Sequence, residues 1–152
     1  MNKSILKIIN LHKYYETGKV TQKVLAGINL DIDSGEFLGI TGDSGSGKST
    51  FLNVIATLDN ITQGKIIFNS AELSALNSNQ KAVIRNKNFG FIFQFHHLLN
   101  EFTALENIII PGLILRVNKS ELIERGRELL NQIKLSDKEN SRPNQLSGGE
   151  QQ

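Results

Sequence analysis

Residues 42–49 read Gly42-Asp43-Ser44-Gly45-Ser46-Gly47-Lys48-Ser49, a glycine-rich stretch that decides the fold. Backbone N–H groups that converge in such a loop can neutralise closely packed phosphate charges without burying many lysines. Glycines permit this geometry because they adopt φ angles and close approaches that a Cβ would block. The stretch therefore predicts a phosphate-binding loop.

The segments on either side of this loop have the character that a nucleotide site requires. Residues 37–41 are short and apolar, as in a strand, and residues 49–58 carry apolar side chains at helical spacing. In a strand, loop and helix of this kind, Lys48 is the point charge for the β- and γ-phosphates. Ser49 offers a hydroxyl oxygen to Mg²⁺, and Thr50 adds a hydrogen bond to phosphate. The sequence predicts that ATP and Mg²⁺ bind here, and this context disfavours a glycine-rich turn without a ligand.

Strands and helices alternate along the rest of the chain. Strands are predicted at residues 5–9, 23–33, 64–68 and 89–93, the first two as an antiparallel pair. Helices are predicted at 79–88, at 103–115 with a kink or a boundary at Pro111-Gly112, and from a cap at Asn118 and Glu121 to near Leu135. The last of these helices has one apolar face, formed by Leu122, Leu129, Leu130 and Ile133. The alternation favours an α/β domain with a largely parallel sheet, preceded by an antiparallel patch.

Composition excludes several classes of site and partner. The chain has no cysteine, so disulfides, thiolate metal sites and cysteine nucleophiles are excluded. Its 17 basic and 15 acidic residues leave a formal charge of +2, which does not favour nucleic acid as a partner. No apolar run reaches bilayer-spanning length, so we expect no direct membrane insertion and attachment only through a partner.

A second motif follows far downstream, at residues 146–150: Leu146-Ser147-Gly148-Gly149-Glu150. Together with the phosphate loop, it resembles the signature sequence of the nucleotide-binding domain of ABC transporters, in which the fifth residue is usually Gln. The resemblance implies that this motif begins a helix. It also implies that Ser147, Gly148 and Gly149 reach the γ-phosphate on the partner's loop across a head-to-tail homodimer in the ATP-bound state.

The same resemblance assigns roles to two further positions. Gln94 matches the glutamine whose side chain meets Mg²⁺ and the attacking water, so Lys48 and Gln94 are the candidate catalytic residues and Ser49 and Gln94 the candidate metal ligands. Tyr15 matches the aromatic residue that stacks on adenine, because a planar base needs a planar partner. Tyr14 could serve instead.

Residues 93–99 and 102–107 narrow the resemblance to ATPase subunits of lipoprotein-releasing complexes, with macrolide-exporter and cell-division ATPases next. This segment contains adjacent histidines, His96 and His97. Neighbouring side chains on a strand or loop diverge, so metal ligation by them is disfavoured. The resemblance implies instead that they contact the membrane subunit.

The resemblance extends over residues 5–152 and implies a partial P-loop NTPase domain. We expect a core at 1–94, a helical subdomain at about 95–145 and the signature at 146–150. By this resemblance we expect the C-terminal part of the family domain, with its catalytic glutamate and switch histidine, to be absent from these residues. The implied function is an ATP-binding subunit that docks on transmembrane permease subunits and is cytoplasmic and peripheral on the inner membrane. We expect these residues alone to bind Mg·ATP weakly, with little or no hydrolysis.

Two alternatives remain open. The chain could be a nucleotide-binding fragment without ATPase activity. A DNA-repair ABC ATPase would share both motifs, but the charge balance and residues 94–99 argue against that class.

Overall fold

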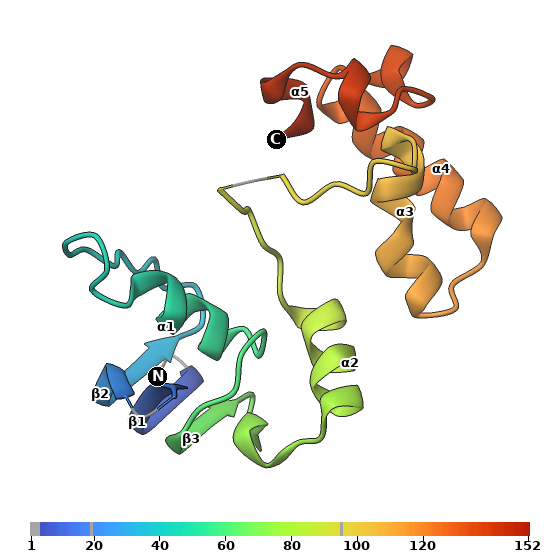
Figure 1. Ribbon diagram of the computed structural model, residues 1–152. Coiled ribbons are helices and arrows are strands. Elements are labelled where there is room, and N and C mark those ends of the chain that lie inside the picture. Colours follow the sequence, from blue (N-terminus) through green and yellow to red (C-terminus); the bar gives the residue numbers. More distant parts are fainter. Residues whose placement is uncertain (1–3, 19, 95) are drawn as a thin grey trace. The chain divides into compact units, whose positions relative to one another are not determined.

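The computed structural model describes residues 4–18, 20–94 and 96–152, which form two compact units, Met1–Phe89 and Gly90–Gln152 (Figure 1). The first unit contains the β-sheet and helices α1 and α2, and the second contains helices α3 to α5. No helix of the described residues is long and apolar enough to cross a bilayer.

The sheet of the first unit has four strands in the order β2-β1-β3-β4, and all neighbours are antiparallel. The strands are β1 (Ser4–Thr17), β2 (Val20–Asp33), β3 (Gln63–Phe68) and β4 (Ala71–Glu72). The predicted antiparallel pair and the predicted strand at 64–68 are therefore confirmed, although β1 and β2 are longer than expected.

Strand β1 contains a bulge that changes which residues face the core. Leu6 and Ile8 are buried before the bulge, and Leu11 and Lys13 are buried after it. Between them the pairing with both β2 and β3 shifts by one residue, and Asn10 adopts a φ of 46°. Because side chains alternate along a strand, one extra residue moves the following positions to the opposite face.

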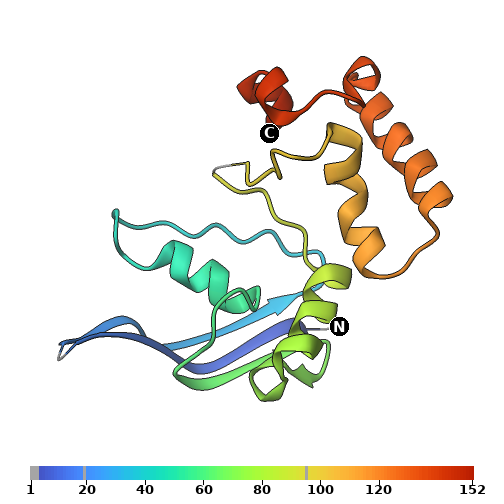
Figure 2. The same cartoon turned by 45° about the vertical axis from the view of Figure 1, so that its right-hand side comes forward.

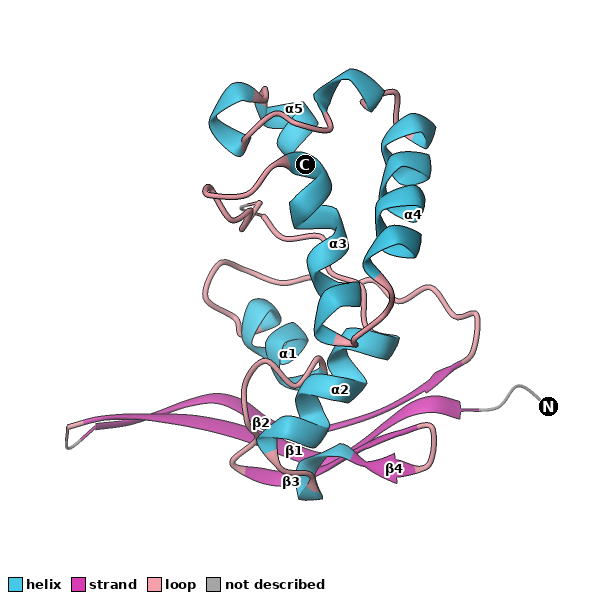
Figure 3. Ribbon diagram, turned by 90° about the vertical axis from the view of Figure 1, so that its right-hand side faces the viewer, coloured by secondary structure: helices cyan, strands magenta, loops and turns pink. Residues whose placement is uncertain are grey.

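Two helices cover one face of this sheet. Helix α1 (Lys48–Ile55) and helix α2 (Ser78–Asn88) lie on the same side of it in Figure 3. Asn77 caps α2 in a reciprocal capping box with Gln80, and a short 3₁₀ turn, η1 (Leu73–Ala75), precedes it. The predicted helices at 49–58 and 79–88 are confirmed. The core of the unit consists of apolar side chains from β1, β2, β3, α1 and η1: Leu6, Ile8, Leu11, Leu25, Phe51, Val54, Ile66 and Leu73.

Two predicted strands are not formed. Residues 37–41 and 89–93 are not part of any strand among the described residues, and Phe37 and Ile92 are 97% and 91% exposed. A strand of a parallel sheet is buried between neighbours that pair with its edges and cover its faces. Neither segment belongs to the four-stranded sheet of the described residues, so that sheet is antiparallel throughout and does not include the predicted parallel part.

In the second unit, helices α3 (Ala104–Ile114) and α4 (Lys119–Gln132) pack side by side and antiparallel, joined by a short loop (Figure 2). They approach closely because Gly126 has no side chain: a Cβ there would lie 2.5 Å from Leu105 Cδ1. Two 3₁₀ turns, η2 (Ser136–Lys138) and η3 (Pro143–Gln145), lead to the last helix, α5 (Gly148–Gln151). Ile109, Leu130 and Leu146 are the buried apolar residues of this unit.

The helix predicted at 103–115 is formed as α3, which runs through Pro111 to Ile114, because a proline in the last turn removes only one intrahelical hydrogen bond. Two details of α4 differ from the prediction. Asn118 caps α4, but its side chain accepts from the Ser120 N–H, so Glu121 does not complete a capping box. Helix α4 ends at Gln132, which leaves Ile133 62% exposed rather than on the packed face.

Candidate nucleotide-binding site

The predicted phosphate loop has the backbone that its glycines were expected to supply. Gly42, Gly45 and Gly47 adopt φ angles of 147°, 80° and 94°. At Gly47 a Cβ would also lie 3.0 Å from the carbonyl oxygen of Val24, a backbone atom that cannot easily move aside. The loop therefore depends on glycine at Gly47 for two reasons, its conformation and its contact with β2.

Helix α1 begins directly after this loop and leaves its N-terminus open to an anion. Gly47 is the N-cap, no side chain caps the helix, and the first turn contains no acidic residue. The N–H groups of a first helical turn have no partner within the helix, and the helix dipole adds partial positive charge there. This end of α1 is therefore suited to phosphate.

Lys48 folds back over the loop that precedes it. Its Nζ donates hydrogen bonds to the carbonyl oxygens of Gly42, at 2.8 Å, and Asp43, at 2.7 Å. The Ser46 hydroxyl lies 3.4 Å from the same nitrogen. These contacts hold the positive charge within the curve of the loop.

Two cavities border this lysine. The first, of about 300 Å³, is called the Tyr15 cavity here, and it brings together the predicted aromatic, phosphate-binding and metal-binding residues. Its lining is Tyr15, Gln22, Val24, Gly45, Gly47, Lys48, Ser49 and Thr50. The second, of about 340 Å³, lies against the other part of the loop, at Gly42 and Ser46, and is otherwise largely apolar.

Of the two candidate tyrosines, only Tyr15 lines that cavity. Its hydroxyl donates to Asp59 Oδ2 at 2.7 Å, and the Lys13 ammonium lies 4.6 Å from the centre of its ring. The hydrogen bond to Asp59 is the main reason that the pKa of Tyr15 is raised. Tyr14 instead makes a hydrogen bond with His12 Nδ1 at 3.0 Å.

Asp59 is a site residue that the sequence did not reveal. Burial alone would raise the pKa of its carboxyl, but hydrogen bonds from Lys13, Tyr15 and the Asn60 backbone outweigh burial, and the pKa is lowered. The ammonium of Lys13, a buried residue, lies 2.7 Å from Asp59 Oδ1. No local signal pointed to Asp59, because it lies 44 residues from Tyr15 along the chain.

The signature motif begins a helix, as predicted. Ser147 is the N-cap of α5, and its Oγ accepts from the Glu150 N–H at 3.4 Å while its own N–H donates to Glu150 Oε2 at 2.7 Å. These bonds lower the pKa of Glu150, so the residue that stands where the family usually has Gln is charged at neutral pH. Gly148 and Gly149 are exposed, and a Cβ would meet nothing within 4 Å at either position. Their contact with phosphate stays a prediction.

The remaining predicted residues lie at the start of the second unit. Gln94 is exposed, and its role at Mg²⁺ stays a prediction. His97 packs edge-on against Phe93 with ring centres 4.9 Å apart, while His96 Nδ1 lies 3.1 Å from Gln152 Oε1. Across residues 4–18, 20–94 and 96–152, no group of three or more histidines or carboxylates could hold a metal ion.

Known proteins resemble this chain closely. The lipoprotein-releasing system ATP-binding protein LolD of Saccharophagus degradans is 43% identical over 152 residues, which are the whole of this chain and 67% of that protein. Two solved structures each superpose with a TM-score of 0.87 at 38% identity: the ATP-binding cassette MJ0796 as a post-hydrolysis dimer bound to ADP and Pi, and dimeric MJ0796, described as a bacterial ABC transporter cassette. Each match covers 97% of this chain and 65% of the solved one, so the chain spans about two thirds of these relatives.

These matches support the P-loop NTPase fold class expected from the sequence, with its mixture of strands and helices. The family model described as ABC transporter matches residues 25–152, which include the phosphate loop, helix α1 and the signature motif. The chain therefore belongs to the ABC transporter family.

Proposed function

We propose that this chain is the ATP-binding subunit of an ABC transporter and binds Mg·ATP at residues 42–50. One observation carries the proposal: the open N-terminus of α1, Lys48 and an aromatic ring border the same cavity. A triphosphate needs the first two, and a base needs the third. Similarity to LolD, which is named for a lipoprotein-releasing system, favours lipoprotein release as the process that the subunit energises.

Different residues of the loop bind different parts of the Mg·triphosphate. Backbone N–H groups of the loop and of the first turn of α1 donate hydrogen bonds to phosphate oxygens. Lys48 gives up its hydrogen bonds to the carbonyl oxygens of Gly42 and Asp43 and binds the β- and γ-phosphates instead. The hydroxyl of Ser49 lines the same cavity and fits Mg²⁺, which prefers oxygen ligands. Gln94 is the second proposed ligand. When bound, Mg²⁺ supplies neutralisation of charge on the transferred phosphoryl group.

The signature helix fits a role in trans. Ser147 uses an oxygen lone pair to cap α5, and its hydroxyl proton can still be donated to a γ-phosphate. We propose that two copies associate head to tail, so that residues 147–149 of each copy close over the nucleotide of the other. The dimeric structures of MJ0796 support association of two copies, and the head-to-tail arrangement is part of the proposal.

Hydrolysis needs a group that orients or deprotonates water. Among the described residues that line the two cavities at Lys48, none carries a carboxylate or an imidazole. We therefore expect the 152 residues alone to bind Mg·ATP and to hydrolyse it little or not at all. In the assembled transporter, we place the subunit on the cytoplasmic side of the inner membrane, attached through permease subunits.

The test is the affinity of Lys48→Ala for Mg·ATP, measured by isothermal titration calorimetry. Loss of the ammonium should weaken binding by at least about tenfold, because hydrogen bonds to charged groups are worth more than neutral ones. Lys87→Ala is the matched control, since Lys87 is an exposed lysine of α2 in the same unit and does not line the cavity. Equal affinity of Lys48→Ala and the unchanged chain would refute the proposal.

A further inference from the structure

The ring of Tyr15 is fixed by two charged residues that lie outside the phosphate loop. Asp59 follows α1 and accepts a hydrogen bond from the Tyr15 hydroxyl, and Lys13 lies on the same strand as Tyr15. We propose that Asp59 and Lys13 are positioning residues: they hold the Tyr15 ring as the surface on which the nucleotide base stacks, and so determine how much the base adds to affinity. This inference rests on the proposed function, because it concerns the same site.

The geometry restricts the ring in two ways. The hydrogen bond to Asp59 anchors the hydroxyl end of a side chain that is otherwise 38% exposed. The Lys13 ammonium lies over the ring, 4.6 Å from its centre, and so occupies one of its two faces. Only the other face is left for a planar partner. A ring that is already oriented loses little rotational freedom when a base stacks on it, and so less of the stacking energy is lost to ordering.

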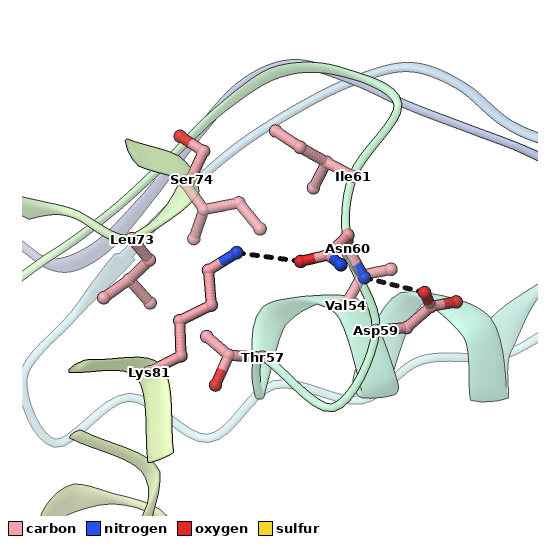
Figure 4. A pocket seen from close by; sticks show the side chains of 9 residues that line it. Val54, Thr57, Asp59, Asn60, Ile61, Leu73, Ser74 and Lys81 are labelled. Carbon is pink, nitrogen blue, oxygen red and sulfur yellow. Dashed lines mark hydrogen bonds between the residues drawn. The ribbon is translucent and has the colours of Figure 1, made fainter. Parts of the chain in front are cut away.

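Asp59 is itself held from several directions. Its Oδ1 accepts from Lys13 Nζ and from the Asn60 N–H, each at 2.7 Å. Lys81 of α2 then holds Asn60 by a 2.8 Å hydrogen bond to Oδ1, and Figure 4 shows Lys81, Asn60 and Asp59 joined in this order beside a cavity of about 250 Å³. The carboxylate that anchors Tyr15 is therefore fixed to β1 and to α2.

Asp59 and Lys13 lie away from the residues that are proposed to bind phosphate. Neither Asp59 nor Lys13 lines the Tyr15 cavity, and neither bonds to a residue of the 42–49 loop in any contact that the described residues show. Replacing Asp59 should therefore reduce the contribution of the base to nucleotide affinity and leave the affinity for the triphosphate group unchanged. A residue that only supported the fold would weaken both equally.

The experiment compares Mg·ATP with Mg·tripolyphosphate, a probe without a base, by isothermal titration calorimetry on the 152-residue chain. The quantity of interest is the ratio of the two dissociation constants. Asp59→Ala and Tyr15→Phe should each lower the preference for ATP by about threefold or more, within the range of aromatic stacking on a base. Combining Tyr15→Phe with Asp59→Ala should lower it no further, because both remove the same hydrogen bond.

Asp59→Asn keeps an oxygen that can accept a hydrogen bond from the Tyr15 hydroxyl, so it should recover part of the preference for ATP. If Asp59→Ala does not fold, the inference is tested with Asp59→Asn alone. Asp31→Ala is the control, because Asp31 is an exposed carboxylate paired with Lys7 elsewhere on the sheet. The inference is overturned if Asp59→Ala and Asp59→Asn keep the full preference for ATP, or if both probes weaken together. Lys48→Ala distinguishes a failure of this inference from a failure of the proposed function. If residues 42–50 do not bind phosphate, Lys48→Ala should leave the affinities for Mg·ATP and Mg·tripolyphosphate unchanged.

Discussion

At the scale of single residues, the contact between Tyr15 and Asp59 predicts an unusual titration. The chain has two tyrosines, so Tyr14→Phe leaves Tyr15 as the only phenol to follow by phenolate absorbance. Its midpoint should lie above the ordinary value of 10.0, because ionisation would remove the hydrogen bond that the hydroxyl donates to Asp59 and would place a second negative charge beside that carboxylate. Adding Asp59→Ala to Tyr14→Phe should lower the midpoint toward 10.0.

The same pKa shifts determine how the stability of the fold depends on pH. The folded pKa of Tyr15 is raised, so its contribution to stability is present below pH 10 and is lost as the pH rises through the folded pKa. The folded pKa of Asp59 is lowered from 3.8, so its contribution is present above that pH and is lost on acidification through the folded pKa. A midpoint at or below 10.0 with the fold intact by circular dichroism would contradict this account.

The residues of the phosphate loop could be identified from sequence because their chemistry is local. Three glycines, a lysine and a hydroxyl residue lie within one short segment, and each acts through its own backbone or side chain. Asp59 could not be identified, because its partner Tyr15 lies 44 residues away and no local pattern joins them. Contacts between distant segments depend on the fold, which a scan for motifs does not supply.

At the scale of elements, the pairing of β1 with β3 depends on Gly64. Its φ is 96°, and a Cβ there would lie 2.3 Å from the Asn10 carbonyl oxygen and 2.6 Å from that of Ile9. Gly64→Ala should lower the free energy of unfolding by about 2–4 kcal/mol, from left-handed backbone strain and a clash with main-chain atoms. Urea denaturation of the purified chain measures this loss.

Gly35→Ala is the matched control for that experiment. Gly35 also has a positive φ, 84°, but a Cβ there would meet nothing within 4 Å, so only the strain of about 1–2 kcal/mol is expected. If Gly64→Ala is no more harmful than Gly35→Ala, the close packing of β1 against β3 is not important for stability.

Most elements could be predicted because periodicity and caps are properties of short segments. The antiparallel strands and helices α1, α2 and α4 follow from alternation, helical spacing and polar caps. Whether Pro111 kinks or ends α3 could not be decided from the sequence, because the cost of a proline depends on how many turns follow it. The apolar segments at 37–41 and 89–93 have the composition of strands, but composition does not decide whether a segment joins a sheet.

At the scale of the whole molecule, burial rather than residue type decides which phenylalanine matters for stability. Phe37 is 97% exposed and Phe51 is 6% exposed. Phe51→Ala should cost about 3–5 kcal/mol of unfolding free energy, since it leaves a cavity in the core. Phe37→Ala should change this free energy by no more than about 0.5 kcal/mol and should reduce self-association, because it removes exposed apolar surface. Urea denaturation and light scattering measure the two effects, and a large loss of stability in Phe37→Ala would contradict the exposure described for it.

The family of the molecule was predictable, because two distant motifs together specify a family more strongly than either does alone. The matches over residues 25–152 and over the whole chain bear this out. We expected a core at residues 1–94 and a helical subdomain from about residue 95, and the described structure divides into two units at Phe89 and Gly90.

The bulge at Asn10 has a consequence for comparing this chain with its relatives. The buried positions of β1 have even numbers up to Ile8 and odd numbers from Leu11 onward, because the one extra residue of the bulge exchanges the two faces of the strand. That reversal is what turns Tyr15, rather than Tyr14, toward α1. An alignment that slides one residue within positions 9 and 10 would therefore exchange the two aromatic rings while preserving every apolar match before it.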